Sequence, residues 1–403
     1  MHRATVLIAL VPLVCAAGEI TFHADVLPIL QRRCQECHRA GEIGPMPLLS
    51  YQQARPWAKS IREAVLMKRM PPWSADPRYG KFRNDLSMTP AEIRTVVEWA
   101  DSGAPEGHPS QAPPPRQFPE GWRAITPDAV FEMPAEARVP ASGELDYQYF
   151  VVPTGFTEDK WVEMAEVRPS NRGVVHHAIV TTRSAGDGGY YRRGEYLAGY
   201  APGMLPQIWK PGQARLIPAG ADLIFQLHYT ANGKAGTDRT RIGLVFAKQP
   251  PRWRIQAMRT STHWLAIPPG AANHQEEAST MIHEEVAMAG MRPHMHLRGK
   301  AFEFRAVYPT GETQILLRVA RYDFNWQPYY YLETPIVLPR GTRIDCTAWY
   351  DNSANNPRNP DPTAHVGWGE QSWDEMMIGW FDVAVELKPG SRGLSGLLRA
   401  PWE

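Results

Sequence analysis

Apolar and polar positions repeat with two different periods along the chain, and the change falls near residue 121. Before it, segments such as HADVLPILQRRC, SYQQARPWAKSIREAVLMK and TPAEIRTVVEWADSGAP carry apolar residues at helical spacing. The last segment opens with a capping box from Thr89 to Glu92, with Pro90 at the first helical position. This pattern predicts a small all-α domain.

Beyond residue 121, short runs rich in β-branched and aromatic residues alternate with turn formers, without a long helical period. They include YQYFVVPTG, GVVHHAIVTT, ADLIFQLHYT, RIGLVFA, AFEFRAVYPTGE and TRIDCTAWYDNS. The 38 prolines and 32 glycines among 403 residues fit many short strands. We predict a mainly β fold with two β-sandwiches, the second beginning at Pro251, joined to the helical part by a proline-rich linker at residues 107–121.

The first 18 residues read as a signal peptide, with a basic Arg3, an apolar core from Val6 to Val14 and small residues after it. The apolar run is shorter than the roughly 20 residues that span a bilayer, and no later segment is long and apolar enough. We therefore expect export from a bacterial cell, periplasmic or secreted, without stable membrane insertion.

Charge argues against one class of partner. The chain has 43 Lys and Arg against 42 Asp and Glu, a net charge of +1, with no basic tract. Nucleic acid is therefore not an expected partner.

The motif CQECH places Cys34, Cys37 and His38 in the C-x-x-C-H order of covalent haem attachment. Two thiols at this spacing can bond the two vinyl groups of one haem, and the adjacent imidazole reaches the iron. A thioredoxin-like pair or half a zinc site are the alternatives. The immediate His38, the signal peptide and the lack of a second cysteine pair count against both.

The sixth iron ligand is open among Met46, Met67 and Met70, and Met70, beside two prolines, is our choice over a core-filling role. The segment FHADVLPILQRRCQECHRAGEIGP with RMPPW resembles the class I cytochrome c domains fused to exported bacterial enzymes. We expect this domain to span residues 19–106.

Histidines of the second part occur in three strand-like runs: His176 and His177 in GVVHHAIV, His228 in FQLHYT, and His294 and His296 in HMHLRGK. A lone strand histidine is more often a core or edge residue than a ligand. Residues two apart on a strand point to one face, so the i, i+2 pair can bind one metal ion. Adjacent residues diverge, and His176 and His177 can share an ion only if the strand ends or bulges there.

Imidazole-rich ligation suits copper or zinc, and a thioether partner favours Cu(I). The run SWDEMMIGWF offers Met376 and Met377. A blue-copper centre is rejected, because no histidine follows Cys346 until His365.

Together, VVHHAIV, QLHYT, HMHLRGK and WDEMM resemble the copper type II, ascorbate-dependent monooxygenases, the family of peptidylglycine α-hydroxylating and dopamine β-monooxygenases. The similarity runs from about Trp122 to Leu387. It implies two jelly-roll-like β-sandwich domains, residues 122–250 and 251–390, followed by a tail at 391–403. Each domain would hold one of two copper ions beside a solvent-filled cleft.

The resemblance also implies ligands and roles. The first copper, which stores and passes an electron, would be bound by His176, His177 and His228. The second, which binds O2 and substrate, would be bound by His294, His296 and Met376. Gln226 would orient solvent or a ligand, and Arg292 lies where peptidyl-substrate enzymes bind a carboxylate.

Two positions depart from the family. Ile378 replaces an asparagine of the carboxylate clamp, which makes a glycine-extended peptide a doubtful substrate. Met377 replaces a cysteine, so Cys346 has lost its disulfide partner and is expected to pack as a small buried group. Met377 also remains a rival ligand to Met376.

We therefore expect a copper-dependent monooxygenase that hydroxylates a C–H bond of a small organic substrate with O2. An external donor would supply electrons through the covalent haem c, or an ascorbate-like reductant would supply them. The alternative is a copper- and haem-binding electron-transfer or copper-handling protein without oxygenase activity. A zinc hydrolase is less favoured, because methionine is a poor zinc ligand. Four histidines lack partners at ligand spacing and are expected to be bystanders: His263, His274, His283 and His365.

Overall fold

A computed structural model describes residues 19–118, 121–143, 145–184, 194–201 and 204–388. The predicted signal peptide and the predicted tail at 391–403 lie outside the described residues. The chain divides into two compact units. The helical unit comprises, within the described residues, 19–40, 44–71 and 87–116, and the second unit comprises 41–43, 72–86 and the chain from 117 onward. Residues 41–43 and 72–86, which lie inside the predicted haem domain, thus group with the second unit.

The helical unit is built around the buried side chains of Phe22 and Trp99. Its elements are η1 (Phe22–Val26), α1 (Leu27–Arg33), α2 (Tyr51–Ala54), η2 (Arg55–Trp57), α3 (Ala58–Leu66), α4 (Pro90–Asp101) and η3 (Pro109–Gln111). The predicted capping box is present at the start of α4: the Thr89 hydroxyl accepts from the Glu92 N–H, and the Glu92 carboxylate accepts from the Thr89 N–H. No helix among the described residues is both long and apolar enough to cross a membrane.

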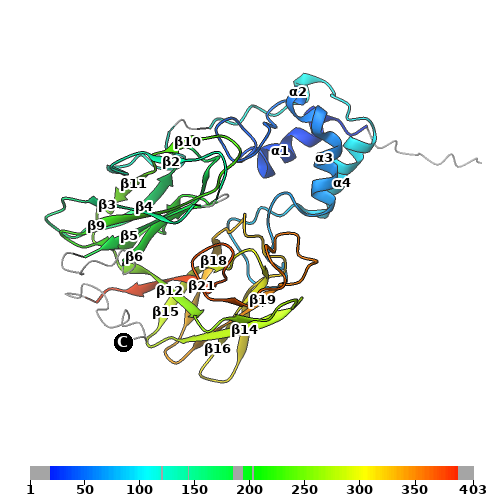
Figure 1. The fold of residues 1–403 in the computed structure, drawn as a ribbon. Helices are drawn as coiled ribbons and strands as arrows, with labels where there is room; N and C mark the ends of the chain where they lie inside the picture. Colours follow the sequence, from blue (N-terminus) through cyan, green and yellow to red (C-terminus); the bar gives the residue numbers. More distant parts are fainter. Residues whose placement is uncertain (1–18, 119–120, 144, 185–193, 202–203, 389–403) are drawn as a thin grey trace, which may run out of the picture. The chain divides into compact units, whose positions relative to one another are not determined.

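The second unit consists of strands, as the short alternating runs predict (Figure 1). The first half contains β1 (Ala129–Glu132), β2 (Ala137–Val139), β3 (Gln148–Pro153), β4 (Lys160–Arg168), β5 (Val175–Arg183), β6 (Glu195–Tyr200), β7 (Gln207–Ile208), β8 (Gln213–Ile217), β9 (Asp222–Tyr229), β10 (Gly236–Asp238) and β11 (Arg241–Phe246). The second half contains β12 (Trp253–Thr262), β13 (Ala266–Ile267), β14 (His274–Met281), β15 (Val286–His294), β16 (Gly299–Val307), β17 (Thr313–Val319), β18 (Tyr330–Leu338), β19 (Arg343–Tyr350), β20 (Val366–Gly367) and β21 (Met377–Glu386).

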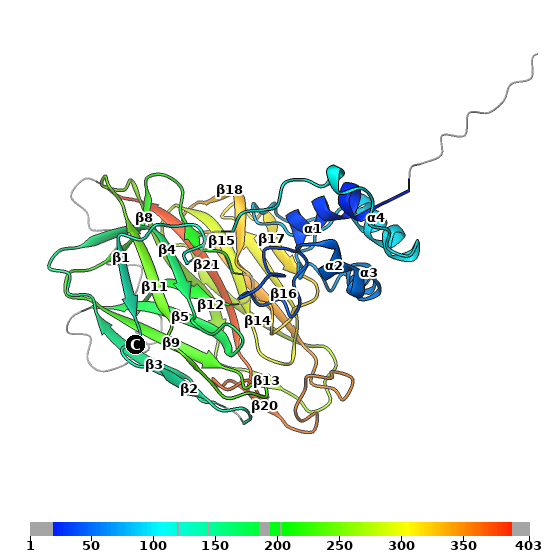
Figure 2. The ribbon, with the colours of Figure 1, turned by 90° about the horizontal axis from the view of Figure 1, so that it is seen from above.

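One nine-stranded sheet runs through both halves in the order β1-β11-β4-β8-β12-β21-β15-β18, with β7 beside β4. The halves meet where β8 and β12 pair in parallel, Gln213 opposite Trp253 and Ala214 opposite Arg254. A second layer, β3-β9-β5-β6, covers the first half, and β14-β19-β16-β17 covers the second (Figures 1 and 2). The fold of the second unit is therefore two pairs of layered sheets that share one continuous sheet.

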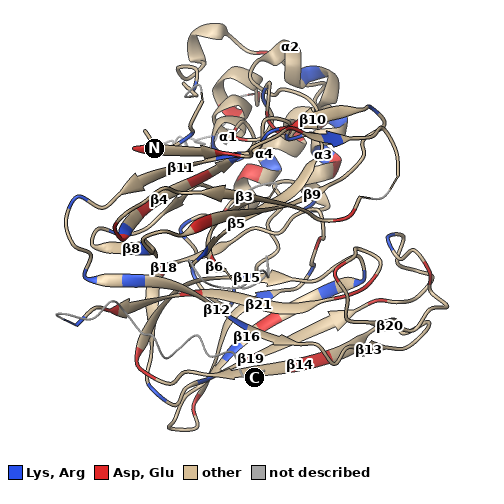
Figure 3. Ribbon diagram, turned by 60° about the vertical axis from the view of Figure 1, so that its left-hand side comes forward, with Lys and Arg blue, Asp and Glu red and all other residues tan. Residues whose placement is uncertain are grey.

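Each pair of layers encloses its own hydrophobic core, because alternate strand residues point inward. Strand β19 shows the pattern clearly: Ile344, Cys346, Ala348 and Tyr350 are buried, while the residues between them are not. Cys346 is thus a fully buried side chain, as expected, and none of the described cysteines is in a disulfide bond. Charged residues of both signs are interspersed along the strands (Figure 3).

Candidate metal centres

The strand that carries His176 and His177 is bulged at those two residues. In the pairing of β5 with β9, Val175 lies opposite Tyr229 and His177 lies opposite His228, so His176 has no partner. An extra residue in one strand bends it locally and changes the direction of its side chains. This is the condition under which adjacent histidines can face one ion.

The bulge brings three imidazoles together. Ligand nitrogens of His176, His177 and His228 all lie within 4.8 Å of one another. The Nδ1 atoms of His176 and His177 are 3.3 Å apart, and the buried Nδ1 of His228 has no hydrogen-bond partner among the described residues. Two nitrogens bound tetrahedrally at about 2.0–2.1 Å from one ion are separated by about 3.3 Å. The group therefore has the spacing of a three-nitrogen metal site.

Burial keeps these imidazoles neutral. It lowers the pKa of His176 to about 4 and that of His228 to about 3, and it lowers the pKa of His177 well below the ordinary value. A metal ligand must be the neutral imidazole, so the three rings are in the required form at neutral pH.

The second pair of histidines departs from the predicted strand pair, because His294 is the last residue of β15 and His296 lies two residues beyond it. Hydrogen bonds fix both tautomers. His294 Nδ1 is 2.7 Å from Gln327 Oε1, and His296 Nδ1 is 3.2 Å from the backbone carbonyl of Asp374. A carbonyl oxygen only accepts, so His296 carries its proton on Nδ1. Gln327 Nε2 donates to the carbonyl of Phe324 at 2.9 Å, which orients the amide and makes His294 Nδ1 the donor as well. Both Nε2 lone pairs remain for a metal ion.

A buried carboxyl group orders the backbone around this pair. Glu375 Oε2 accepts from the His296 N–H at 2.8 Å and from the Met376 N–H at 3.3 Å, and Oε1 accepts from the Arg298 N–H at 2.7 Å. Glu375 is fully buried, which raises its pKa to about 8. This one side chain ties the histidine segment to the methionine segment.

The strand period separates the two methionines. Met377 is fully buried in the second core, whereas Met376 lines a cavity together with Ile378 and Trp380. Because β21 begins at Met377 and alternates, the residues at 376, 378 and 380 share the cavity face. Of the two methionines, Met376 is therefore the one that lines the same cavity as His294.

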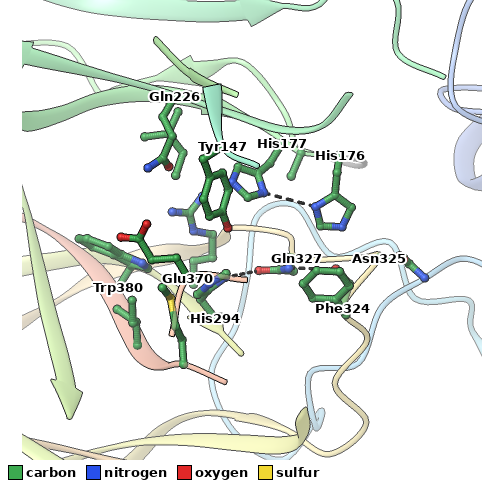
Figure 4. A pocket seen from close by; sticks show the side chains of 15 residues that line it. Tyr147, His176, His177, Gln226, His294, Phe324, Asn325, Gln327, Glu370 and Trp380 are labelled. Atoms are coloured by element: carbon green, nitrogen blue, oxygen red, sulfur yellow. Dashed lines mark hydrogen bonds between the residues drawn. The ribbon is translucent and has the colours of Figure 1, made fainter. Parts of the chain in front are cut away.

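Both groups of histidines border this cavity, which has a volume of about 160 Å³ (Figure 4). Gln226 lines it and donates from Nε2 to the Tyr149 hydroxyl at 2.8 Å. Arg292 also lines it, with its guanidinium 5.6 Å from the ring of Tyr196. All the predicted residues around the copper sites except His228 and His296 thus line one cavity, and those two contact the others.

The cavity also contains residues that sequence reasoning missed. Tyr147 packs edge-on against His228, with ring centroids 4.9 Å apart, and Glu370 points into the same space (Figure 4). Gln327 lines the cavity as well, and Glu375, which is buried outside the lining, accepts hydrogen bonds from the backbone N–H groups of His296 and Met376. Glu375 stands inside the WDEMM motif, but the remaining three carry no local signal in the sequence.

The CQECH motif, predicted to attach haem, follows α1 directly in the helical unit. The N–H groups of Cys37 and His38 both donate to the carbonyl of Cys34, which forms a tight turn. His38 Nδ1 is 3.0 Å from the carbonyl of Met46, so its Nε2 is left for iron. A Cβ at Gly44 would lie 2.6 Å from the Cys37 oxygen and 2.9 Å from His38 Cγ, so only glycine allows this loop to pack behind the imidazole.

The three candidate sixth ligands differ in position. The Met46 carbonyl lies at Nδ1 of His38, and its side chain is partly buried against the helical core. Met67 and Met70 are 54% and 42% exposed. Leu49, Trp57 and Leu66 of this unit are also exposed, so it presents apolar surface that a haem could cover.

The bystander histidines lie outside both groups. His263 stacks on Trp368 at 4.5 Å, and His274 Nε2 is 2.8 Å from Glu276 Oε1. His283 and His365 are exposed.

Comparisons with known proteins give little further information. No family model matches the chain. Among solved structures it is similar to the major capsid protein P2 of bacteriophage PM2, at 10% identity over 65% of this chain and 99% of that one, with a TM-score of 0.30. It is also similar to infectious bursal disease virus, Gt strain (8% identity, 69% and 75% covered, TM-score 0.20), and to Paenibacillus xanthan lyase (12%, 72% and 29%, 0.17). At such low TM-scores these similarities support no inference about the fold or function of this chain.

Proposed function

We propose that this chain is an exported, copper-dependent monooxygenase that hydroxylates a C–H bond of a small organic molecule with O2. In this proposal two jelly-roll-like β-sandwich domains follow a small cytochrome c domain. The observation that carries it is that two groups of imidazoles, whose pKa values burial lowers, border a single cavity that Met376 also lines.

The donor sets fit copper. His176, His177 and His228 would hold one ion through three nitrogens. His294, His296 and Met376 would hold a second through two nitrogens and a sulfur, a set that suits Cu(I) better than zinc. Copper, when bound, supplies one-electron chemistry and reaction with O2. The buried and otherwise unpartnered Nδ1 of His228 is the kind of atom that a bound cation would satisfy.

The chain's own residues would select the substrate and orient the ligands. A cavity of about 160 Å³ is smaller than the roughly 300–1,000 Å³ of drug-sized sites, so it favours a small molecule. Ile378 and Trp380 give it an apolar wall beside Met376, while Arg292 and Gln226 supply polar groups. The hydrogen bonds from His294 and His296 to Gln327 and Asp374 hold the imidazoles in the ligating tautomer.

The helical unit would bring electrons from an external donor. Cys34 and Cys37 would attach a haem, His38 would bind its iron from one side, and Met70 is our choice for the other. The loop that contains Gly44 supports this assignment, because it packs against His38 and its Met46 carbonyl orients the His38 ring.

Metal content and coupled turnover test the proposal. We expect two copper ions per chain and an α-band haem spectrum. With a reductant, we expect O2 consumption that matches hydroxylated product for at least one member of a panel of small substrates. His228→Ala should lose one copper and the activity. The matched control, His274→Ala, removes an imidazole outside the cavity and should keep both. Peroxide release without product across the whole panel would instead favour a copper-handling or electron-transfer protein.

A further inference from the structure

One aromatic side chain that is not a metal-ligand candidate contacts a histidine of each group. The Phe324 ring stacks on His176, with centroids 4.5 Å apart and an interplanar angle of 22°. The same ring meets His296 edge-on, with centroids 5.9 Å apart and an angle of 81°. Phe324 is 8% exposed, and Figure 4 shows its ring beside His176 at the edge of the cavity.

The segment that carries this ring is also tied to the second group through hydrogen bonds. Residues 320–329 connect β17 to β18. Within this connection, the Tyr322 hydroxyl donates to the Met295 carbonyl and accepts from the Met295 N–H, between the two histidines. Gln327 links the carbonyl of Phe324 to His294 Nδ1. The 320–329 segment therefore contacts both histidines of the second group, His294 and His296, and also Met295 between them.

Phe324 contacts the first group through both its ring and its backbone. The face of the ring stacks on His176, and the Phe324 backbone also hydrogen-bonds that imidazole, which partly offsets the lowering of the His176 pKa by burial. His176 is the extra residue of the β5 bulge, so strand pairing holds it less firmly than His177. A flat apolar ring packed on its face restricts the rotation of the imidazole.

We propose that Phe324 is a positioning residue that sets the spacing between the two metal centres. It fills the space between a ligand of each group, and the 320–329 segment fixes the ring relative to His294 and His296. Its contact with His176 then fixes the first group relative to the second. This inference rests on the proposed function, because it assumes that both groups bind copper.

The separation of two Cu(II) ions, measured by pulsed electron paramagnetic resonance on the full chain, tests the proposal. We expect one narrow distance distribution for the wild-type protein loaded with two copper ions. Phe324→Leu removes the ring face and should broaden or shift the distribution while both ions stay bound. Phe324→Tyr keeps the ring and should restore the narrow distribution, and Phe324→Trp should shift it to a longer distance.

The control is Phe246→Leu. Phe246 lies on β11, its ring packs on Phe156, and it does not line the cavity. It should leave the distribution unchanged. An unchanged distribution in both Phe324→Leu and Phe324→Trp, with two ions bound, would overturn the spacing role alone. Failure of the wild-type chain to bind two copper ions would overturn the proposed function and the spacing role together. If Phe324→Leu does not fold, Phe324→Trp decides the question.

Discussion

Replacing Gln327 by methionine removes hydrogen bonds from the second metal group with little change in side-chain volume. Gln327 is 8% exposed, accepts from His294 Nδ1 at 2.7 Å and donates to the Phe324 carbonyl at 2.9 Å. In the variant both of these partners lose their hydrogen bond in a buried place. The His294 ring can then rotate or change tautomer, which takes its Nε2 lone pair away from the metal.

The size of the effect follows from two independent ranges. Leaving one buried polar group without a partner costs about 1–3 kcal/mol. Removing a hydrogen-bond partner of a metal-bound histidine weakens metal binding about 10–100-fold, or about 1.4–2.7 kcal/mol. The ranges overlap, so we expect copper to bind His294, His296 and Met376 about 10–100-fold more weakly.

A chelator competition titration measures this loss, since it resolves the two copper ions of one chain as separate steps. Only the step of the methionine-containing group should shift, and the step of the three-histidine group should stay. Gln327→Glu keeps an acceptor for His294 and should retain more affinity than methionine does. Gln314→Met, at an exposed position, is the control. Wild-type affinity in Gln327→Met, or an equal loss at both steps, would refute the reasoning.

Three further predictions follow from single contacts. Met376→Leu should weaken one copper site in the same titration, whereas Met377→Leu should spare both and cost less than about 1.5 kcal/mol in urea unfolding, because it conserves core volume. Asp382→Asn leaves the buried Arg215 guanidinium, now 2.6 Å from Asp382, without its counter-charge and should cost about 3–5 kcal/mol; the double variant with Arg215→Met should recover most of it. In the copper-free protein, the unfolded chain takes up a proton at His176 near pH 6.5, whereas the folded chain does so only near pH 4. The free energy of unfolding should therefore fall as the pH drops from 6.5 to 4, and His176 should contribute about 3 kcal/mol to this fall. Urea unfolding at pH 7.5 and at pH 4.5 measures the difference. The same free energy of unfolding at both pH values would contradict the argument that His176 is buried in the neutral form.

Some of this organisation could be predicted from the sequence because it depends on local spacing. His294 and His296 do meet, with ring centroids 5.2 Å apart, but β15 ends at His294, so the predicted strand does not extend to His296. The alternation along β21 decides which of Met376 and Met377 faces the cavity once one neighbour is known to be buried. The capping box of α4 is equally local. The strand-rich second part follows from the same periodicity, although it does not show that one sheet continues through both halves.

The residues that hold the ligands in place could not be predicted in this way. Gln327 and Glu375 act across 33 and 79 residues of sequence, on His294 and His296 respectively. Gln327 stands at no spacing that marks a site, and the position of Glu375 inside WDEMM does not reveal that its carboxyl group binds the backbone of His296. Nothing in the sequence distinguishes Phe324 from the other aromatic residues, and only the fold places its ring between His176 and His296. Such contacts depend on how loops pack, which the period of the pattern does not determine.

The adjacent histidines lie between these two cases. From the sequence one can say that His176 and His177 face one ion only if their strand is irregular, but not whether the strand is irregular. The fold meets it because the pairs on both sides of the bulge are held by the core. Val175 pairs with Tyr229 and Ala178 pairs with Leu227, and all four side chains are buried. Between these pairs β5 has two residues and β9 has only His228. A slip that removed the extra residue would move one set of buried side chains to the opposite face of its strand. Hydrophobic burial therefore enforces the bulge, and the three residues enclosed by the two buried pairs are the three histidines.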